Sequence, residues 1–350
     1  MKPRPISNPP NPWSATSVDF LGEPPAARLH VYEDATREIL SRNDSPDVGF
    51  TWSVNPYRGC GHACAYCYAR PTHEYLGFGA GTDFDTRIVA KLRAAGLLRE
   101  AFERPSWRGE TVVFSGVTDP YQPLEASLRL TRACLEVCAA YRNPVGLITK
   151  SALVERDLDL WERLGREARA HVAISLPFLD AARARAIEPG AAAPERRLLA
   201  MSRLAAAGLP VTVMVAPVIP GLNDEEIPRV LEAAAAAGAR SAGFVLLRLP
   251  GSVKAVFEER LRAALPDRAE RVLHRVRETR GGALYDSRFG TRGRGEGPYA
   301  QAIAALFAAS ARRAGLRAGP DSWHGPSTFR RPGSQLGLFG DGDPAPARAP

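Results

Sequence analysis

Cysteine and methionine are scarce in this chain of 350 residues, which contains five and three of them, and long apolar runs are absent. Without about 18 consecutive apolar residues, no membrane-spanning helix is expected. The polar, proline-rich start Met1–Pro5 lacks the apolar core of a secretory signal. So few cysteines argue against a disulfide-stapled secreted domain and favour a reducing cytoplasm, where we expect the protein. The composition, 45% hydrophobic and 24% charged, is typical of a globular protein with a sizeable core.

Three of the five cysteines nevertheless fall within eight residues. Cys60, Cys64 and Cys67 form a CxxxCxxC spacing. Three thiolates can bind three irons of a cubic iron–sulfur cluster and leave the fourth iron open for a small ligand. The alternative is a structural zinc site, for which His62 or His73 would supply the fourth ligand. The spacing favours the cluster, because a zinc knuckle ordinarily uses paired short spacings and no second such pair is present.

Strand-like and helix-like segments alternate through the middle of the chain. Strands are expected at 49–54, 111–114, 145–149, 172–176, 211–215 and 244–247, and helices at 86–104, 124–141, 153–169, 195–207, 224–238 and 253–264. This alternation implies an α/β fold with a parallel sheet, because parallel strands need crossover connections. The pattern alone leaves open whether the sheet forms a full barrel, a partial barrel or an open, doubly wound sheet.

Polar residues follow the ends of these strands. In chain order they are the cysteine loop, Thr118-Asp119-Pro120, Lys150, Ser175, Ala216-Pro217 and Arg248. Because the chemistry of β/α barrels collects at the carboxyl ends of the strands, we expect all of them on one rim.

The flanking segments differ in composition from this α/β unit, which we place at 46–265. Residues 1–45 are rich in proline and are predicted to form an extended arm. Residues 266–317 are predicted to continue as helices at 266–280 and 299–314 that cap the barrel, with a glycine- and arginine-rich loop at 281–297 between them. Residues 318–350 have the composition of a mobile tail.

Positive charge is unevenly distributed along the chain, whose net charge is +8. Between Arg260 and Glu296, ten arginines accompany five acidic residues. Such a segment suits a phosphate backbone. The alternative is a solvated helix face followed by a flexible loop.

The cysteine spacing, with Tyr66 directly before its last cysteine, resembles the signature of the radical S-adenosylmethionine (SAM) enzymes. Within that superfamily the chain resembles the spore photoproduct lyase group and an uncharacterised bacterial branch beside it, over about residues 48–250. Besides the cysteines, the resemblance lies in Thr118-Asp119-Pro120, Ile148-Thr149-Lys150, Ser175, Glu188-Pro189 and Val215-Ala216-Pro217-Val218-Ile219. It implies a partial (β/α)6 barrel, a [4Fe-4S] cluster and SAM as cofactors, and reductive cleavage of SAM to methionine and a 5′-deoxyadenosyl radical.

The resemblance also implies roles for individual residues. Cys60, Cys64 and Cys67 would ligate the cluster. The SAM contacts would be Tyr66 and Ala216 at the adenine, Lys150 at the carboxylate, Ser175 at the ribose or carboxylate, and Thr118 and Asp119 near the amino group. The alternatives are an exposed strand end for Lys150 and a satisfied core hydroxyl for Ser175.

The chain departs from the lyase pattern just after the second strand. There the lyase has a cysteine that returns a hydrogen atom to the product radical, whereas residues 114–119 here read Phe-Ser-Gly-Val-Thr-Asp. Repair of the spore thymine dimer by that route is therefore in doubt. Tyr121 is a candidate substitute donor, with a packing role as the alternative. Cys134 and Cys138 share an apolar face of a predicted helix and are expected in the core.

A short apolar motif, Gln335, Leu336, Gly337, Leu338 and Phe339, interrupts the polar tail. It resembles the QLxLF peptides by which bacterial DNA repair and replication proteins dock on the sliding clamp. Two leucines and a phenylalanine in an unstructured tail would gain burial in a partner's groove. The alternative is that they fold back onto the barrel.

The sequence therefore predicts a radical SAM enzyme that acts on an unidentified substrate, with DNA lesion repair as the leading hypothesis. A flavodoxin or ferredoxin is the expected electron donor. The alternatives are modification of RNA or protein by the same chemistry, and a zinc-stabilised nucleic-acid-binding module without catalysis.

Overall fold

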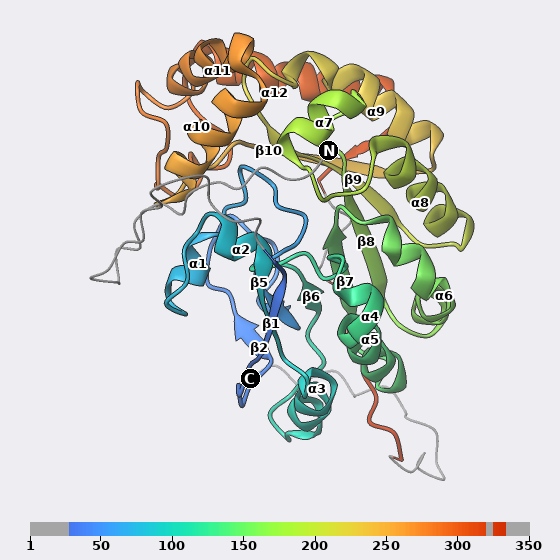
Figure 1. The fold of residues 1–350 in the computed structure, drawn as a ribbon. Helices are drawn as coiled ribbons and strands as arrows, with labels where there is room; N and C mark the ends of the chain where they lie inside the picture. The colour runs from blue at the N-terminus through green and yellow to red at the C-terminus, as the bar shows by residue number, and fades with distance from the viewer. Residues whose placement is uncertain (1–27, 320–324, 334–350) are drawn as a thin grey trace, which may run out of the picture.

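The computed structural model describes residues 28–319 and 325–333, which form a curved sheet with helices packed along its outer face (Figure 1). The tail motif at 335–339 and much of the predicted N-terminal arm therefore lie outside the described residues. None of the helices in the described part combines the length and apolar character needed to cross a membrane.

The main sheet has eight strands in the order β11-β10-β9-β8-β7-β6-β3-β2. They are β2 (Leu40–Arg42), β3 (Trp52–Val54), β6 (Val112–Phe114), β7 (Val145–Thr149), β8 (Ala170–Ser175), β9 (Val211–Val218), β10 (Ser241–Leu246) and β11 (Arg317–Ala318). Neighbours from β3 to β11 pair in parallel, and β2 pairs antiparallel with β3. Because β3, β6, β7, β8, β9 and β10 follow one another in the chain and across the sheet, the predicted partial (β/α)6 barrel is confirmed.

Helices follow these six strands and bury their apolar faces against the sheet. The longer ones are α3 (Ala94–Glu103), α5 (Leu130–Ala140), α6 (Leu158–Glu167), α8 (Pro194–Ala206), α9 (Ile227–Ala236) and α10 (Val253–Ala264). In α6, for example, Leu160, Trp161 and Leu164 are buried at helical spacing. Every residue of β8 is buried, as expected for a parallel strand covered on both faces.

A second, three-stranded sheet lies beside the barrel. Its strands, in order, are β1 (His30–Glu33), β5 (Arg87–Ala90) and β4 (Tyr57–Arg58). Four short helices lie between these elements: α1 (Pro71–Glu74), α2 (Thr82–Thr86), α4 (Glu125–Leu128) and α7 (Ala181–Ile187). Two 3-10 turns, at Ala152–Asp157 and Asp224–Glu226, precede α6 and α9.

Two predicted helices are wrong in part. The first eight residues of the segment 86–104 contain strand β5, which the β-branched Ile88-Val89 pair favours, and the helix begins only at Ala94. The segment 124–141 breaks into α4 and α5 at Arg129, whose backbone is left-handed with φ 54°. In addition, β1 and β2 lie within the stretch 1–45 that the sequence predicts as an extended arm, and both are paired into sheets.

The C-terminal helices extend the outer layer. They are α11 (Pro266–Glu278) and α12 (Gly297–Arg313), as predicted from the sequence, and α12 lies near α9 in Figure 1. Residues 325–333 then pack against the residues that follow α5. Phe329 stacks on Tyr141 with ring centroids 6.1 Å apart, and the Arg330 N–H donates to the Tyr141 carbonyl at 2.8 Å.

Candidate active site

The cysteine loop connects β4 to α1 and is shaped by backbone contacts with both sides. The Cys60 N–H donates to the Phe84 carbonyl at 2.9 Å. Gly59 has φ +78°, and a Cβ there would lie 2.9 Å from that same carbonyl oxygen, so the position requires glycine. Gly190 donates its N–H to the His62 carbonyl at 3.0 Å, and a Cβ on Gly190 would lie 2.2 Å from the Gly61 carbonyl oxygen.

The three cysteines of the loop are free thiols. Cys60 and Cys64 are buried and Cys67 is half-buried, and none forms a disulfide. Burial, followed by the nearby Cys60, raises the pKa of Cys67 to about 11, against the opposing effect of Arg70. Burial and then Glu188 raise the pKa of Cys64, whereas Lys150 opposes this shift. Three thiols that act on one another's charge suit a polynuclear centre.

The two histidines of the zinc alternative lie in different surroundings. Among the described residues, no three His, Cys, Asp or Glu side chains converge closely enough to hold one metal ion. His73, one candidate fourth ligand, is buried with its Nε2 2.8 Å from the Arg87 carbonyl. His62, the other, has Nδ1 3.4 Å from Asp119 Oδ2, and its side chain also hydrogen-bonds Cys60. A cube spreads its thiolates over separate irons and does not require such convergence on a single point.

Residues after β6 hold the cysteine loop from the other side. The Thr118 hydroxyl donates to the Gly59 carbonyl at 2.7 Å. Gln122 donates from Nε2 to the same carbonyl at 3.1 Å and accepts the Gly61 N–H at Oε1, also at 3.1 Å. Thr118 thus braces the loop, and Gln122 is a bracing residue that sequence analysis missed.

Asp119 connects the end of β6 to the end of β7. Its Oδ1 accepts the Thr149 hydroxyl at 2.6 Å and its Oδ2 accepts the Lys150 N–H at 2.8 Å. Burial would raise the pKa of Asp119, but His62, Thr149 and the Lys150 N–H outweigh it and lower the pKa to about 2. Asp119, Lys150 and the cysteine loop are therefore brought together as predicted.

This carboxylate gives a pH-dependent prediction. Because the folded pKa lies below the ordinary value of 3.8, the stabilisation is complete above about pH 4 and is lost as the pH falls through about 2. We expect Asp119→Asn to lower the unfolding free energy of the apoprotein by about 2 kcal/mol at pH 6. Urea titrations at pH 6 and pH 2 should show the difference between variant and wild type closing at the lower pH.

A buried polar cluster lies behind the cysteine loop at the ends of β7 and β8. The Tyr66 hydroxyl bonds to the Glu188 carboxylate, which Arg197 also binds through Nη2 at 2.5 Å. Arg197 Nη1 donates in turn to the Ser175 carbonyl at 3.0 Å. The Lys150 ammonium lies 5.7 Å from the centre of the Tyr66 ring. Burial opposes ionisation of Glu188, yet Arg197 and Lys150 lower its pKa, so this carboxylate is anionic.

Ala216 lies near the carboxyl end of β9, where regular strand pairing stops. The last regular pair with β8 joins Met214 to Ser175, and the register against β10 shifts between Phe244 and Leu246. Ala216 falls opposite this irregularity and is followed by Pro217, which has no N–H to donate. Its backbone therefore lies outside the regular pairs of both neighbouring strands.

Tyr121 is placed in the main hydrophobic core, fully buried. Its hydroxyl donates to Asp157 Oδ2 at 2.9 Å and accepts the Trp161 indole N–H at 3.3 Å. This position matches the packing alternative, and it gives the donor hypothesis no support. Cys134 and Cys138 are also fully buried in this core, as expected.

Tyr68 and Arg248 are two further residues beside the cysteine loop. Tyr68 directly follows Cys67 and is 47% exposed. The side chain of Ser115 hydrogen-bonds its hydroxyl, and the Arg248 guanidinium lies 5.5 Å from its ring centre. The only signal for Tyr68 in the sequence is its position next to Cys67.

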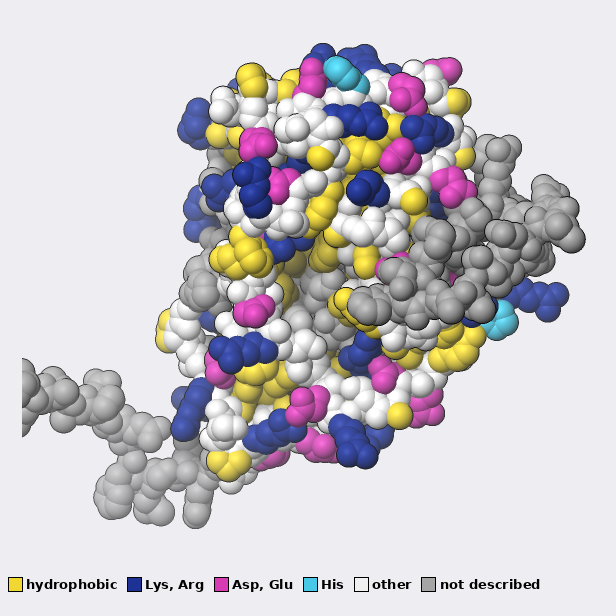
Figure 2. Space-filling view, turned by 90° about the vertical axis from the view of Figure 1, so that its left-hand side faces the viewer, with side chains coloured by type: hydrophobic (Ala, Val, Ile, Leu, Met, Phe, Trp, Pro, Cys, Tyr) yellow, Lys and Arg dark blue, Asp and Glu magenta, His cyan; other side chains and the backbone are white. Residues whose placement is uncertain are grey.

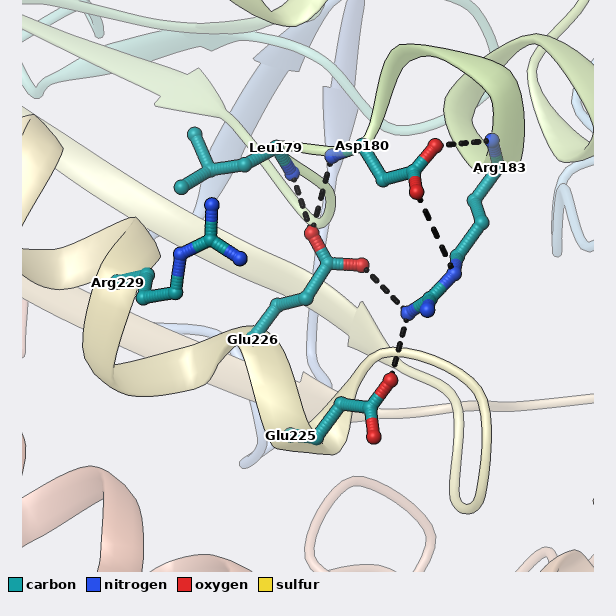
Figure 3. Close-up of a pocket in the computed structure, with 6 residues that line it drawn as sticks. All are labelled: Leu179, Asp180, Arg183, Glu225, Glu226 and Arg229. Atoms are coloured by element: carbon teal, nitrogen blue, oxygen red, sulfur yellow. Dashed lines mark hydrogen bonds and ion pairs between the residues drawn. The ribbon is translucent and has the colours of Figure 1, made fainter.

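Figure 2 shows a depression between the upper and lower halves of the molecule, with hydrophobic side chains in its wall and Lys and Arg side chains around it. A separate cavity of about 380 Å³ is lined by Leu179, Asp180, Arg183, Glu225, Glu226 and Arg229 (Figure 3). There Arg183 bonds to both Glu225 and Glu226, and Glu226 also accepts the backbone N–H groups of Leu179 and Asp180. These charges largely satisfy one another, and none of the cysteines lines this cavity.

Comparison with known proteins agrees with this architecture. The family model of the radical SAM superfamily matches residues 54–234. An uncharacterised protein of Mycobacterium tuberculosis is 43% identical over 224 residues, which are 63% of this chain and 66% of the relative. An uncharacterised protein of Methanocaldococcus jannaschii is 29% identical over 184 residues, which are 53% of this chain and 66% of the relative. The alignments thus span just under two thirds of these relatives.

Solved structures of spore photoproduct lyase share the fold. One variant superposes with a TM-score of 0.57 at 19% identity, covering 83% of this chain and 81% of the lyase. The lyase complexed with dinucleoside spore photoproduct gives a TM-score of 0.57 at 18% identity, covering 82% and 81%. A variant with bound AdoMet and the same dinucleoside gives 0.53 at 18% identity, covering 83% and 81%.

Proposed function

The chain belongs to the radical SAM superfamily and is therefore an enzyme, and on that premise we propose that Cys60, Cys64 and Cys67 hold a [4Fe-4S] cluster to which SAM binds. The observation that carries the proposal is that three free, largely buried thiols lie on one short loop, which residues after β6 hold in place. When bound, the cluster supplies the electron that cleaves SAM into methionine and a 5′-deoxyadenosyl radical. The apolar residues around Cys64, among them Phe178 and Leu249, keep water away.

The chain's own residues would hold SAM around this loop. Lys150 supplies a cation for the SAM carboxylate, and its backbone is fixed by Asp119. The Tyr66 ring lies near Lys150, and its hydroxyl is hydrogen-bonded to Glu188. A ring fixed in this way would form one side of the adenine site. Ala216 offers backbone groups outside the regular strand pairs. Ser175 lies at the end of β8, held through its carbonyl by Arg197, close to this group.

The first test is chemical analysis of the protein after anaerobic reconstitution. We expect iron and acid-labile sulfide in similar amounts, absorbance at about 400 nm, and 5′-deoxyadenosine after addition of SAM and dithionite. A flavodoxin or ferredoxin should replace dithionite as the reductant. Bound zinc without sulfide, and no SAM cleavage, would refute the assignment and favour the zinc-stabilised binding module.

Lys150 allows a quantitative prediction about SAM binding. Lys150→Met removes the proposed partner of the carboxylate and should weaken SAM binding at least about tenfold, the usual effect of losing a hydrogen bond to a charged group. Equilibrium dialysis on the reconstituted protein measures this, with iron content as the check that the cluster is intact. Lys254→Met is the matched control, because Lys254 is exposed on α10. Equal SAM affinity in both variants would contradict the role of Lys150.

We propose a nucleic acid, with damaged DNA first, as the substrate. Two exposed aromatic rings beside the barrel each carry a guanidinium on one face: Arg248 lies over Tyr68, and Arg292 lies 4.2 Å from the ring centre of Phe289. Burial opposes the shift, but the Gly290 N–H, Arg292 and Arg248 together lower the pKa of Asp47, and Arg292 also forms an ion pair with this carboxylate. Exposed rings stack bases, and guanidiniums contact phosphates.

The substrate class is tested by following 5′-deoxyadenosine release. We expect ultraviolet-damaged duplex DNA to increase release above the level with undamaged duplex, RNA of equal length or a random peptide. Stimulation by RNA or peptide alone would instead favour the alternative of RNA or protein modification. The fold shared with the lyase does not distinguish these outcomes, because the identity is below 20%.

A second proposal concerns the tail. We propose that Gln335, Leu336, Leu338 and Phe339 dock on a bacterial sliding clamp, because residues 325–333 anchor the chain just before them through Phe329. The double variant Leu338→Ala/Phe339→Ala should bind a purified clamp at least about tenfold more weakly than the full chain, as expected for hot-spot residues. Leu306→Ala, which changes an exposed leucine on α12, is the control. Unchanged binding in the double variant, or no clamp binding by the wild type, would refute it.

A further inference from the structure

A carboxylate behind the cysteine loop, whose side chain is 10% exposed, joins two arginines that are far apart in the sequence. Asp85, in α2, accepts Arg70 Nη2 at 2.8 Å and also forms an ion pair with Arg260 of α10. Arg70 is fully buried, and Arg260 is 8% exposed. In Figure 1, α2 belongs to the lower half of the molecule and α10 to the upper half. Asp85, Arg70 and Arg260, which we call the trio, therefore link the two halves of the molecule next to the cysteine loop.

The guanidiniums of Arg70 and Arg260 both donate hydrogen bonds to the cysteine loop, at the carbonyls of the consecutive residues Ala63 and Cys64. Arg70 donates to the Cys64 carbonyl from Nε at 3.1 Å and from Nη2 at 2.8 Å. Arg260 donates from Nη1 to the Ala63 carbonyl at 2.7 Å. Ala63 has φ +54°, a left-handed conformation that costs energy for a residue with a Cβ. The two arginines thus hold the loop in a shape that the loop alone would not favour.

The trio also carries a net charge next to the thiols. Two guanidiniums and one carboxylate leave one positive charge, and both guanidiniums contact the backbone at Ala63 and Cys64 directly. A neutral donor could bind the same carbonyls, so the charge is not needed for hydrogen bonding alone. A fixed positive charge near an iron–sulfur centre stabilises its more negative, reduced state.

We propose that Arg70, Arg260 and Asp85 are positioning residues that hold the cysteine loop for the cluster and that set, through their net charge, how readily the cluster is reduced. The inference rests on the proposed function, because it requires the cluster. It differs from that function in predicting a direction for each charge change. Loss of Arg260 makes reduction harder, and loss of the Asp85 charge makes it easier.

The experiment is a reductive titration of the reconstituted full-length protein, followed by the electron paramagnetic resonance signal of the reduced cluster. At a fixed potential, Arg260→Gln should show a reduced-to-oxidised ratio about tenfold below wild type, equal to a shift of about 59 mV for one electron. Asp85→Asn should shift the ratio in the opposite direction. Arg260→Lys keeps the charge and should restore the wild-type ratio. Arg262→Gln, an outward-facing change on the same helix, should have no effect.

A second measurement separates positioning from general stability. Iron release to a chelator should be faster in Arg260→Gln than in wild type. The apoproteins of Arg260→Gln and Arg260→Lys should nevertheless unfold at similar temperatures. If Arg260→Gln and Asp85→Asn shift the ratio in the same direction, or neither shifts it, the inference is overturned while the cluster assignment stands. A wild-type protein that binds no cluster would refute the proposed function and this inference with it.

Discussion

Replacing Cys64 with alanine should reduce bound iron and sulfide to background and abolish 5′-deoxyadenosine formation. The same result is expected for Cys60→Ala and Cys67→Ala. The physical reason is that a cube held by only two thiolates exposes two irons to water and loses the geometry that presents a single iron to SAM. We expect activity to fall at least about 100-fold, more than changes in groups that merely support metal ligands cause.

The matched control for this prediction is Cys138→Ala. Cys138 is a free thiol, like the others, but it is fully buried in the main core on α5. This variant should keep full iron and sulfide content, with only the modest loss of stability expected for removing one buried sulfur atom. Iron retained in Cys64→Ala, or lost in Cys138→Ala, would show that the cluster site has been placed wrongly.

The sequence predicts most of the barrel because its signals there are local. The apolar runs that became β6, β7, β8 and β9 are flanked by helical spacing, and each pattern reflects burial of one short segment. Prediction fails where tertiary pairing decides the structure. Ile88-Val89 lies in a stretch whose spacing also fits a helix, and it becomes a strand because β1 and β4 pair with it on either side.

The site shows the same division between local and distant information. The spacing of Cys60, Cys64 and Cys67 makes them candidates, and the places of Lys150 and Ser175 at strand ends do the same for those two residues. Arg260 carries no such signal: it is one of many arginines in a basic segment, and only the fold brings it to the Ala63 carbonyl, 197 residues away. Tyr121 is a candidate because it lies close in sequence to the position of the missing cysteine, but its side chain lies in the core, as the packing alternative expects.

The pair formed by Glu188 and Arg197 gives the second large expected effect. Both side chains are almost completely buried, and the carboxylate also receives the Tyr66 hydroxyl. Arg197→Met would leave Glu188 charged and without its main partner in a low-dielectric site. We expect the unfolding free energy of the apoprotein to fall by about 3–5 kcal/mol, measured by urea titration. In comparison, Arg203→Met on the same helix breaks an exposed pair with Glu155 and should cost about 0–1 kcal/mol.

The double variant Glu188→Gln/Arg197→Met distinguishes an isolated charge from lost packing. Because the glutamine leaves no buried charge, the double variant should be more stable than Arg197→Met alone, and the two single losses should not add. Additive losses would mean that the two side chains stabilise the fold independently, contradicting the contact between them. The same pair positions Tyr66 and Ser175, so Glu188→Gln should also weaken SAM binding in the reconstituted enzyme while its iron content stays unchanged. Loss of iron in that variant would instead place Glu188 among the residues that hold the cysteine loop.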